Sequence, residues 1–82
     1  MTRGRESGEN LAIAYYDRGL SFSIKGDNDR AIVDYGKAIA LDPKYASAYN
    51  NRGLAYYNRG NEYWALTDYD KAIELNPKYA DA

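Results

Sequence analysis

Cysteine and histidine are both missing from the 82-residue sequence. Their absence excludes disulfides, metal sites built from thiolates or imidazoles, cysteine nucleophiles and Ser-His catalysis. A chain without cysteine fits an intracellular setting, and we expect a cytoplasmic protein. Because covalent and metal-assisted catalysis most often depends on these residue types, we expect a protein that is not an enzyme and that uses no cofactor.

An excess of one charge and long apolar runs are missing as well. The 11 basic and 12 acidic residues give a formal net charge of -1, and the two signs alternate along the chain. No basic stripe is therefore available to follow a nucleic-acid backbone. No apolar run approaches the length needed to span a bilayer or to form the core of a signal peptide. We expect neither nucleic acid nor a membrane as a partner.

Phenylalanine and tryptophan occur once each, whereas tyrosine occurs ten times. Tyrosine combines a large apolar ring with a polar tip, which suits both half-buried helix faces and interfaces. A chain of this length makes one small domain, near the lower size limit for a stable core without disulfides or metal. Additional stabilisation from repeated or assembled units is therefore expected.

Proline is also scarce, and the two prolines reveal a repeat. Pro43 and Pro77 lie 34 residues apart, and aligning residues 12–45 with 46–79 without gaps places the same residue at half of the positions. A period of this length is typical of solenoids, whose units bury their apolar faces against one another.

Apolar residues at helical spacing, glycines and the two prolines predict two helices in each unit. Gly26 and Gly60 end the first helix of each unit, and Asp27 and Asn61 follow as caps of the second. Ser7 or Asn10 is expected to cap the first helix of the chain. From these signals, the first helix is expected from Leu11 to the Lys25-Gly26 turn and the second from the Asp27 cap to Asp42-Pro43. The third and fourth are expected over residues 45–59 and 62–75.

The chain is therefore divided into four parts. Residues 1–10 are expected to form a flexible lead-in, because they are polar and lack periodicity. Residues 11–45 form the first unit and residues 46–79 the second. Residues 80–82 read as the truncated start of another helix.

Gly19 and Gly53 lie in the middle of helices, where glycine costs on the order of 1 kcal/mol relative to alanine. A close approach of the paired helices explains why glycine occurs at this position in both units despite its cost. Gly19 is expected to face Ala31 or Ala38, and Gly53 the equivalent Ala65 or Ala72. Tyr15, Phe22, Tyr35 and their equivalents would then fill the flanks.

Both units resemble the tetratricopeptide-repeat pattern W-x2-L-G-x2-Y, A-x3-F and P. Tyrosine replaces the pattern's tryptophan, and arginine replaces its leucine. The two arginines are expected near the surface, with the guanidinium reaching solvent or a carboxylate. The units read Tyr15-x2-Arg18-Gly19-x2-Phe22, Ala31-x3-Tyr35 and Pro43, then Tyr49-x2-Arg52-Gly53-x2-Tyr56, Ala65-x3-Tyr69 and Pro77.

The resemblance implies an all-α chain, an α-α superhelix of two helix-turn-helix units and the start of a third. It also implies that the first helix of each unit lines a concave groove that binds a peptide or a partner protein. The alternative is a solvated surface on which Leu20 and Leu54 contact the neighbouring unit. The groove residues expected on the two first helices are Ile13, Tyr16, Asp17, Leu20, Ile24, Ser47, Asn50, Asn51, Leu54, Tyr57 and Asn58.

One function known in this family is the gripping of chaperone tails by a clamp of Lys and Asn residues. Asn51 matches the middle Asn of that clamp. Tyr16 and Leu20 stand where its first Lys and Asn would be, and the third unit is absent. The clamp is therefore disfavoured.

The second unit also carries aromatic residues that the first lacks, and solenoid units need neighbours to cover their apolar faces. We therefore expect a homo-oligomer, formed by end-to-end stacking or by exchange of a helix between copies. Alternatively, Tyr63 fills the space of the aromatic residue that this family usually has at the position of Glu62. The expected self-association residues are Tyr63, Trp64, Leu66, Tyr69 and Ile73.

Four classes of function remain to be weighed. The leading hypothesis is a protein-binding adaptor, and the second is a self-assembling scaffold, natural or engineered. An enzyme is disfavoured, because Asp68, Asp70 and Glu74 lie at helical spacing beside Lys71, where solvated charge pairing is the ordinary explanation. RNA binding by a helical-repeat array is disfavoured because a basic stripe is lacking.

Overall fold

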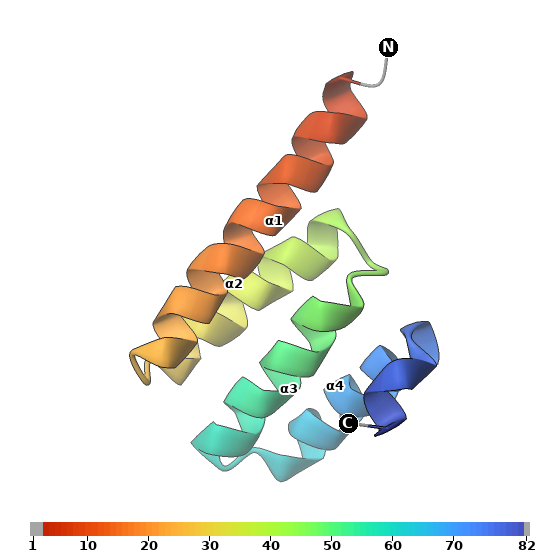
Figure 1. Ribbon diagram of the computed structural model, residues 1–82. Coiled ribbons are helices and arrows are strands. Elements are labelled where there is room, and N and C mark those ends of the chain that lie inside the picture. The colour runs from red at the N-terminus through yellow and green to blue at the C-terminus, as the bar shows by residue number, and fades with distance from the viewer. Residues whose placement is uncertain (1–2, 82) are drawn as a thin grey trace.

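The computed structural model describes the backbone of residues 3–81 and the side chains of residues 8–79. Within these residues the chain is all-α, and its four helices pack as adjacent pairs (Figure 1). The prediction of two helix-turn-helix units is thereby confirmed. The elements are α1 (Arg3–Ile24), α2 (Asn28–Leu41), α3 (Ala46–Arg59), α4 (Glu62–Leu75) and the 3-10 helix η1 (Pro77–Asp81).

The turns within the two units form where the sequence predicts them. Gly26 and Gly60 have φ angles of 83° and 93°, the left-handed region that glycine adopts without a steric penalty. The Asp27 side chain accepts a hydrogen bond of 3.2 Å from the backbone N–H of Arg30, which confirms it as the cap of α2. Asn61 occupies the same position before α4, but its side chain makes no capping hydrogen bond.

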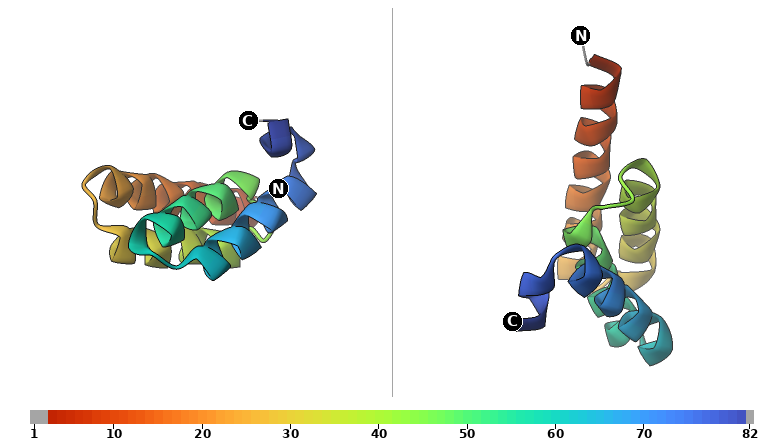
Figure 2. Two further views of the ribbon diagram at one scale, coloured as in Figure 1. Left: turned by 90° about the horizontal axis from the view of Figure 1, so that it is seen from below. Right: turned by 90° about the vertical axis from the view of Figure 1, so that its right-hand side faces the viewer.

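The expected start of the first helix is wrong. α1 begins at Arg3, so Ser7 and Asn10 lie inside the helix and neither caps it. Arg5 and Glu6 come shortly before Gly8 and Glu9 follows it, and the helix preference of these residues carries α1 through the glycine. As a result, α1 projects beyond α2 towards the N-terminus (Figure 2). The division between a lead-in and a first unit at residue 10 stays a prediction.

The other end of the chain also differs from the simple helix start that the sequence suggests. After Pro77 the backbone forms the 3-10 helix η1. The N–H of Tyr79 donates to the carbonyl of Asn76 at 3.1 Å, which tightens this turn. The expected start of a helix at residues 80–82 includes Ala82, which lies outside the described residues.

Small residues and tyrosine rings bring the two helices of each unit together. A Cβ atom on Gly19 would lie 2.8 Å from the ring of Tyr35 and 3.3 Å from the carbonyl oxygen of Ala31. At Gly53 the equivalent distances are 3.0 Å to the Tyr69 ring and 3.1 Å to the Ala65 carbonyl. The expected approach to Ala31 and Ala65 is therefore confirmed.

Two details of that packing prediction are corrected. Tyr35 was expected to fill a flank, but its ring lies directly against Gly19, where it is fully buried. Ala38 and Ala72 are buried, but they are not among the atoms nearest to the glycines. The crossing is therefore a contact of backbone with an aromatic ring, because only glycine leaves room for a ring at this position.

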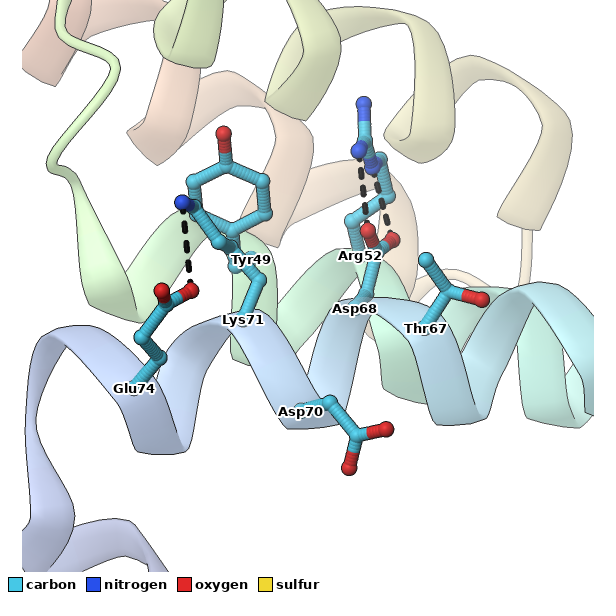
Figure 3. Close-up of a pocket in the computed structure, with 7 residues that line it drawn as sticks. All are labelled: Tyr49, Arg52, Thr67, Asp68, Asp70, Lys71 and Glu74. Carbon is cyan, nitrogen blue, oxygen red and sulfur yellow. Dashed lines mark hydrogen bonds and ion pairs between the residues drawn. The ribbon is translucent and has the colours of Figure 1, made fainter.

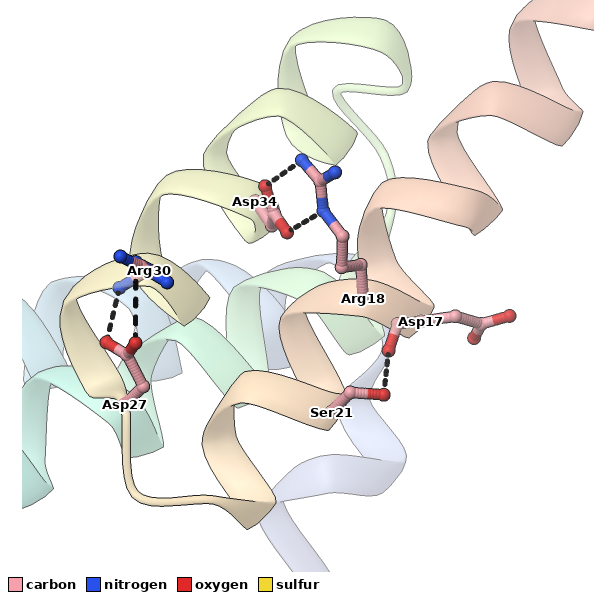
Figure 4. Close-up of polar contacts among 6 residues, drawn as sticks. All are labelled: Asp17, Arg18, Ser21, Asp27, Arg30 and Asp34. Carbon is pink, nitrogen blue, oxygen red and sulfur yellow. Dashed lines mark hydrogen bonds and ion pairs between the residues drawn. The ribbon is translucent and has the colours of Figure 1, made fainter.

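A charge pair lies next to each glycine contact. Arg18 precedes Gly19, and its guanidinium donates to the Asp34 carboxylate from Nε at 2.7 Å and from Nη2 at 3.0 Å (Figure 4). Arg52 binds Asp68 in the same way, at 2.7 and 2.9 Å. These two-point hydrogen bonds confirm the expectation that the arginines reach carboxylates.

Burial of Asp34 and Asp68 overturns the interpretation of Asp68 as a solvated carboxylate, since both residues are only 3 % exposed. The hydrogen bond to its aspartate raises the pKa of each arginine further. Arg52 is also covered by the first unit, and its side chain is 22 % exposed against 58 % for Arg18.

The two units meet where α3 lies on α2. Ala55 of α3 packs against Ala31 and Tyr35 of α2 in one buried cluster, with Tyr16, Phe22 and Ile32 around it. At the far end of α3, Arg59 Nε lies 2.7 Å from the Asp29 carboxylate. The interface thus has a small apolar centre and an ion pair at one end. None of the helices in the described part of the chain is long and apolar enough to cross a membrane.

The glycine contact can be tested by Gly53→Leu. Because the added side chain meets the Tyr69 ring and the Ala65 carbonyl, we expect the free energy of unfolding to fall by at least about 2 kcal/mol. Urea unfolding followed by circular dichroism measures this change. Gly8→Leu is the matched control, since a Cβ on Gly8 meets nothing within 4 Å and the helix should not be weakened. Equal stability of both variants would contradict the packing.

The buried ion pair can be tested by Arg52→Met. This change leaves the Asp68 carboxylate buried without its cation, and we expect a loss of about 2 to 3 kcal/mol of unfolding free energy. The additional change Asp68→Leu removes the stranded charge and should restore part of the loss. A double variant that is less stable than Arg52→Met would refute this explanation.

Candidate functional site

Tyr16 and Asn51, two of the expected groove residues, join the first helices of the two units. Asn51 Nδ2 donates to the Tyr16 hydroxyl at 2.6 Å. The Tyr16 ring stacks on Tyr45, with 5.0 Å between the ring centroids, and lies 5.7 Å from the ring of Tyr35. Burial, with the neighbouring Tyr35 hydroxyl, raises the pKa of Tyr16. These contacts place α1 and α3 side by side and fix one face across the two units.

Ser47 is another expected groove residue that the fold already uses. Its hydroxyl shares a hydrogen bond of 2.7 Å with the hydroxyl of Tyr79 in η1. Ser47 therefore holds η1 against α3. Two groups that were expected to meet a ligand thus make contacts within the fold: the Asn51 amide joins the two units, and the Ser47 hydroxyl joins α3 to η1. The sequence pattern did not reveal these contacts.

The other expected groove residues divide by helix. On α1, Ile13, Asp17, Leu20 and Ile24 are exposed, and the Ser21 hydroxyl donates to the backbone carbonyl of Asp17 (Figure 4). On α3, Leu54, Tyr57 and Asn58 are exposed and Asn50 is half-buried. The leucines are 37 % and 47 % exposed, so each still presents apolar surface. The free part of this face is therefore a set of apolar side chains with polar groups between them.

A second surface lies between α3 and α4, around a hollow of about 360 Å³ (Figure 3). Four of its charged residues form ion pairs, Arg52 with Asp68 and Lys71 with Glu74 at 3.2 Å. The expected solvated pairing is confirmed for Lys71 and Glu74, whereas Asp70 points away from both pairs (Figure 3). The lining residues are Tyr49, Arg52, Thr67, Asp68, Asp70, Lys71 and Glu74. Residues 8–79 hold no cluster of three or more potential metal ligands.

The outer face of α4 holds most of the expected self-association residues. Tyr63 and Leu66 are 74 % and 63 % exposed, Ile73 is also exposed, and Tyr69 is half-buried. Burial raises the pKa of Tyr69. A hollow of about 320 Å³ opens on this face, and its lining comes from α3 and α4: Tyr57, Glu62, Ala65, Leu66 and Tyr69.

Trp64 differs from the other four expected contact residues. Its ring lies 6.4 Å from the Tyr56 ring of its own unit and does not line the hollow. Tyr63 meets Trp64 edge to face at 5.3 Å. Since Tyr63 is largely exposed, it does not fill an internal space in place of an aromatic residue at Glu62.

The carboxylates of Asp34 and Asp68 orient Arg18 and Arg52, a role that the sequence analysis missed for Asp34 and misinterpreted for Asp68. A signal was available, because the arginine and the aspartate recur in both units and are separated by 16 residues each time. Two opposite charges that repeat together across a helix pair indicate a contact rather than two solvated groups.

Comparisons with known proteins agree with this geometry. A family model described as "TPR repeat" matches residues 19–60, and one described as "Tetratricopeptide repeat" matches residues 46–79. No curated protein sequence matches this chain significantly.

Two solved structures, described as crystal structures of MamA, are similar to this chain. Both are 38 % identical to it, with TM-scores of 0.75 and 0.77 over 85 % and 87 % of its length. This chain spans only 38 % and 42 % of those two chains. Repeat length, helix pairing and both family models therefore agree, and the chain belongs to the tetratricopeptide-repeat family.

Proposed function

We propose that the chain is a protein-interaction module that binds a peptide or a partner protein along the joined faces of α1 and α3, without catalysis. The observation that carries this proposal is the bond between Tyr16 and Asn51, which aligns the two helices. The exposed Leu20 and Leu54 give that face apolar contact area. Membership of a family whose repeats bind proteins supports the same conclusion.

The chemistry of this face favours a ligand with both apolar side chains and free polar groups. Asn50 and Asn58 carry amides that both donate and accept hydrogen bonds, which suits a peptide backbone. Asp17 adds one carboxylate at the edge of the face. A peptide with alternating apolar and polar residues matches these groups, and Leu20 and Leu54 of this chain contact its apolar side chains.

This proposal is tested with a peptide library displayed on phage and selected on the immobilised chain. Calorimetry then measures the selected peptides against Leu54→Lys and Leu20→Lys, and we expect affinity to fall by about tenfold or more, since each lysine removes an apolar anchor. Val33→Lys is the matched control, because Val33 is more exposed than either leucine but lies on α2. Peptides that bind Leu54→Lys as well as the unchanged chain would contradict the proposal.

A second candidate function is self-assembly, and the outer face of α4 favours it. Leu66 lines the 320 Å³ hollow and exposes its side chain, and Tyr63 and Ile73 are exposed on the same helix. A contiguous apolar surface next to a hollow is typical of an interface. We infer that copies of this chain associate through this face, with Trp64 and Tyr69 as further contact residues.

Light scattering across a concentration range tests this second candidate. We expect the average mass to rise with concentration, and Leu66→Glu to weaken association by about tenfold because it places a charge at the interface. Val33→Glu should associate like the unchanged chain. A constant monomeric mass, together with a cooperative melting transition, would exclude self-assembly.

A further inference from the structure

The outer face of α4 repeats the face of α2 on which α3 lies. On α2, Ala31 and Tyr35 receive Ala55 of α3. Ala65 and Tyr69 stand at the same positions of the second unit, and here they line the open hollow. The second unit therefore has, on α4, a surface that matches the one on which α3 packs.

The outer face of α1 repeats the face of α3 that lies on α2. In the 34-residue alignment Ser21 takes the place of Ala55, a small residue in both units. Arg18 takes the place of Arg52, and Lys25 the place of Arg59. All three α1 residues are exposed. The chain therefore forms this helix interface once, between α2 and α3, and exposes a second copy of each of its two surfaces, on α4 and on α1.

The charged residues on the outer faces of α1 and α4 determine whether these two surfaces can pack against each other. In the existing interface Arg59 pairs with Asp29, and Arg52 passes Gly36, where a Cβ would lie 3.6 Å from its Nη1 atom. In the second unit Tyr63 takes the place of Asp29, and Asp70 that of Gly36. Glu62 takes the place of Asn28, which lines one hollow together with Arg59 in the existing interface.

If α1 of a second copy packs on α4, its two cations come close to the anionic residues Glu62 and Asp70. Lys25 would meet Glu62 and the Tyr63 ring, and Arg18 would meet Asp70. The free Nη1 side of Arg18 suits this contact, because its bonds to Asp34 use Nε and Nη2. Opposite charges at both ends of the contact favour a second copy of the chain over other helices.

We propose that copies of this chain associate head to tail, with the second half of α1, residues 17–25, seated on the first half of α4 of the next copy. Ser21 enters the hollow between Tyr57 and Tyr69, and Lys25 pairs with Glu62. η1 follows the other end of α4, and none of its side chains that the structure describes, residues 77–79, lines the hollow. The proposal rests on the proposed self-assembly and names the surfaces that perform it.

This contact joins two different surfaces, so it leaves one free surface of each kind at the ends of every assembly. Such an interface extends into open chains unless its rotation closes a ring. The exposed Lys25 and Glu62 carry the specificity, while Ala65, Leu66 and Tyr69 carry the apolar contact.

The test is a charge exchange between Lys25→Glu and Glu62→Lys, followed by sedimentation or light scattering at low salt. Each variant alone sets like charges against each other, and we expect association to weaken by about tenfold. An equimolar mixture restores opposite charges at every junction and should associate nearly as strongly as the unchanged chain. Lys44→Glu, in the exposed turn between the units, is the control and should associate normally.

The outcomes separate this inference from the self-assembly on which it rests. Rescue by mixing supports the head-to-tail contact, and circular dichroism confirms that each variant is folded. If the unchanged chain assembles but the single variants also assemble, or the mixture does not recover, the proposed surfaces are wrong although self-assembly stands. If the unchanged chain stays monomeric, both proposals fail.

Discussion

The contact of a helix backbone with a tyrosine ring is the constraint on which both units depend. At Gly19 and Gly53 a side chain of any size would meet the ring of Tyr35 or Tyr69. Once that ring is seated, the neighbouring residues of both helices are placed as well, so the arginine before each glycine reaches the aspartate before each tyrosine. A local helix penalty of about 1 kcal/mol is thus offset by tight packing and by an ion pair to a buried aspartate.

The helix pairing within a unit occurs twice in this chain, whereas the contact between the units occurs once. Tyr16 and Asn51 form one cross-unit bond, and in the second unit Asn50 takes the place of Tyr16. Shared residues therefore specify how each helix pair folds. Residues that differ between the units determine what each face can bind, which is why the interaction proposals depend on them.

Much of the fold could be predicted from the sequence, because the signals are local. Gly26 and Gly60 end helices through their own backbone conformation, and apolar spacing identifies the helices between them. The start of α1 could not be predicted in this way, since a helix continues through a weak residue such as Gly8 when its neighbours favour helix. The candidate site was less predictable, because burial of Asp68 and the bonding of Asn51 depend on partners far along the chain.

The central claim is that α1 and α4 carry the two unpaired halves of an interface that α2 and α3 already form. Hydrogen exchange measured at rising protein concentration tests it most directly, because an interface slows local opening of the helices that form it. We expect the amides of residues 17–25 and of residues 62–70 to gain protection together, at the same concentration. Protection that rises in only one of these segments, or elsewhere in the chain alone, would contradict the claim.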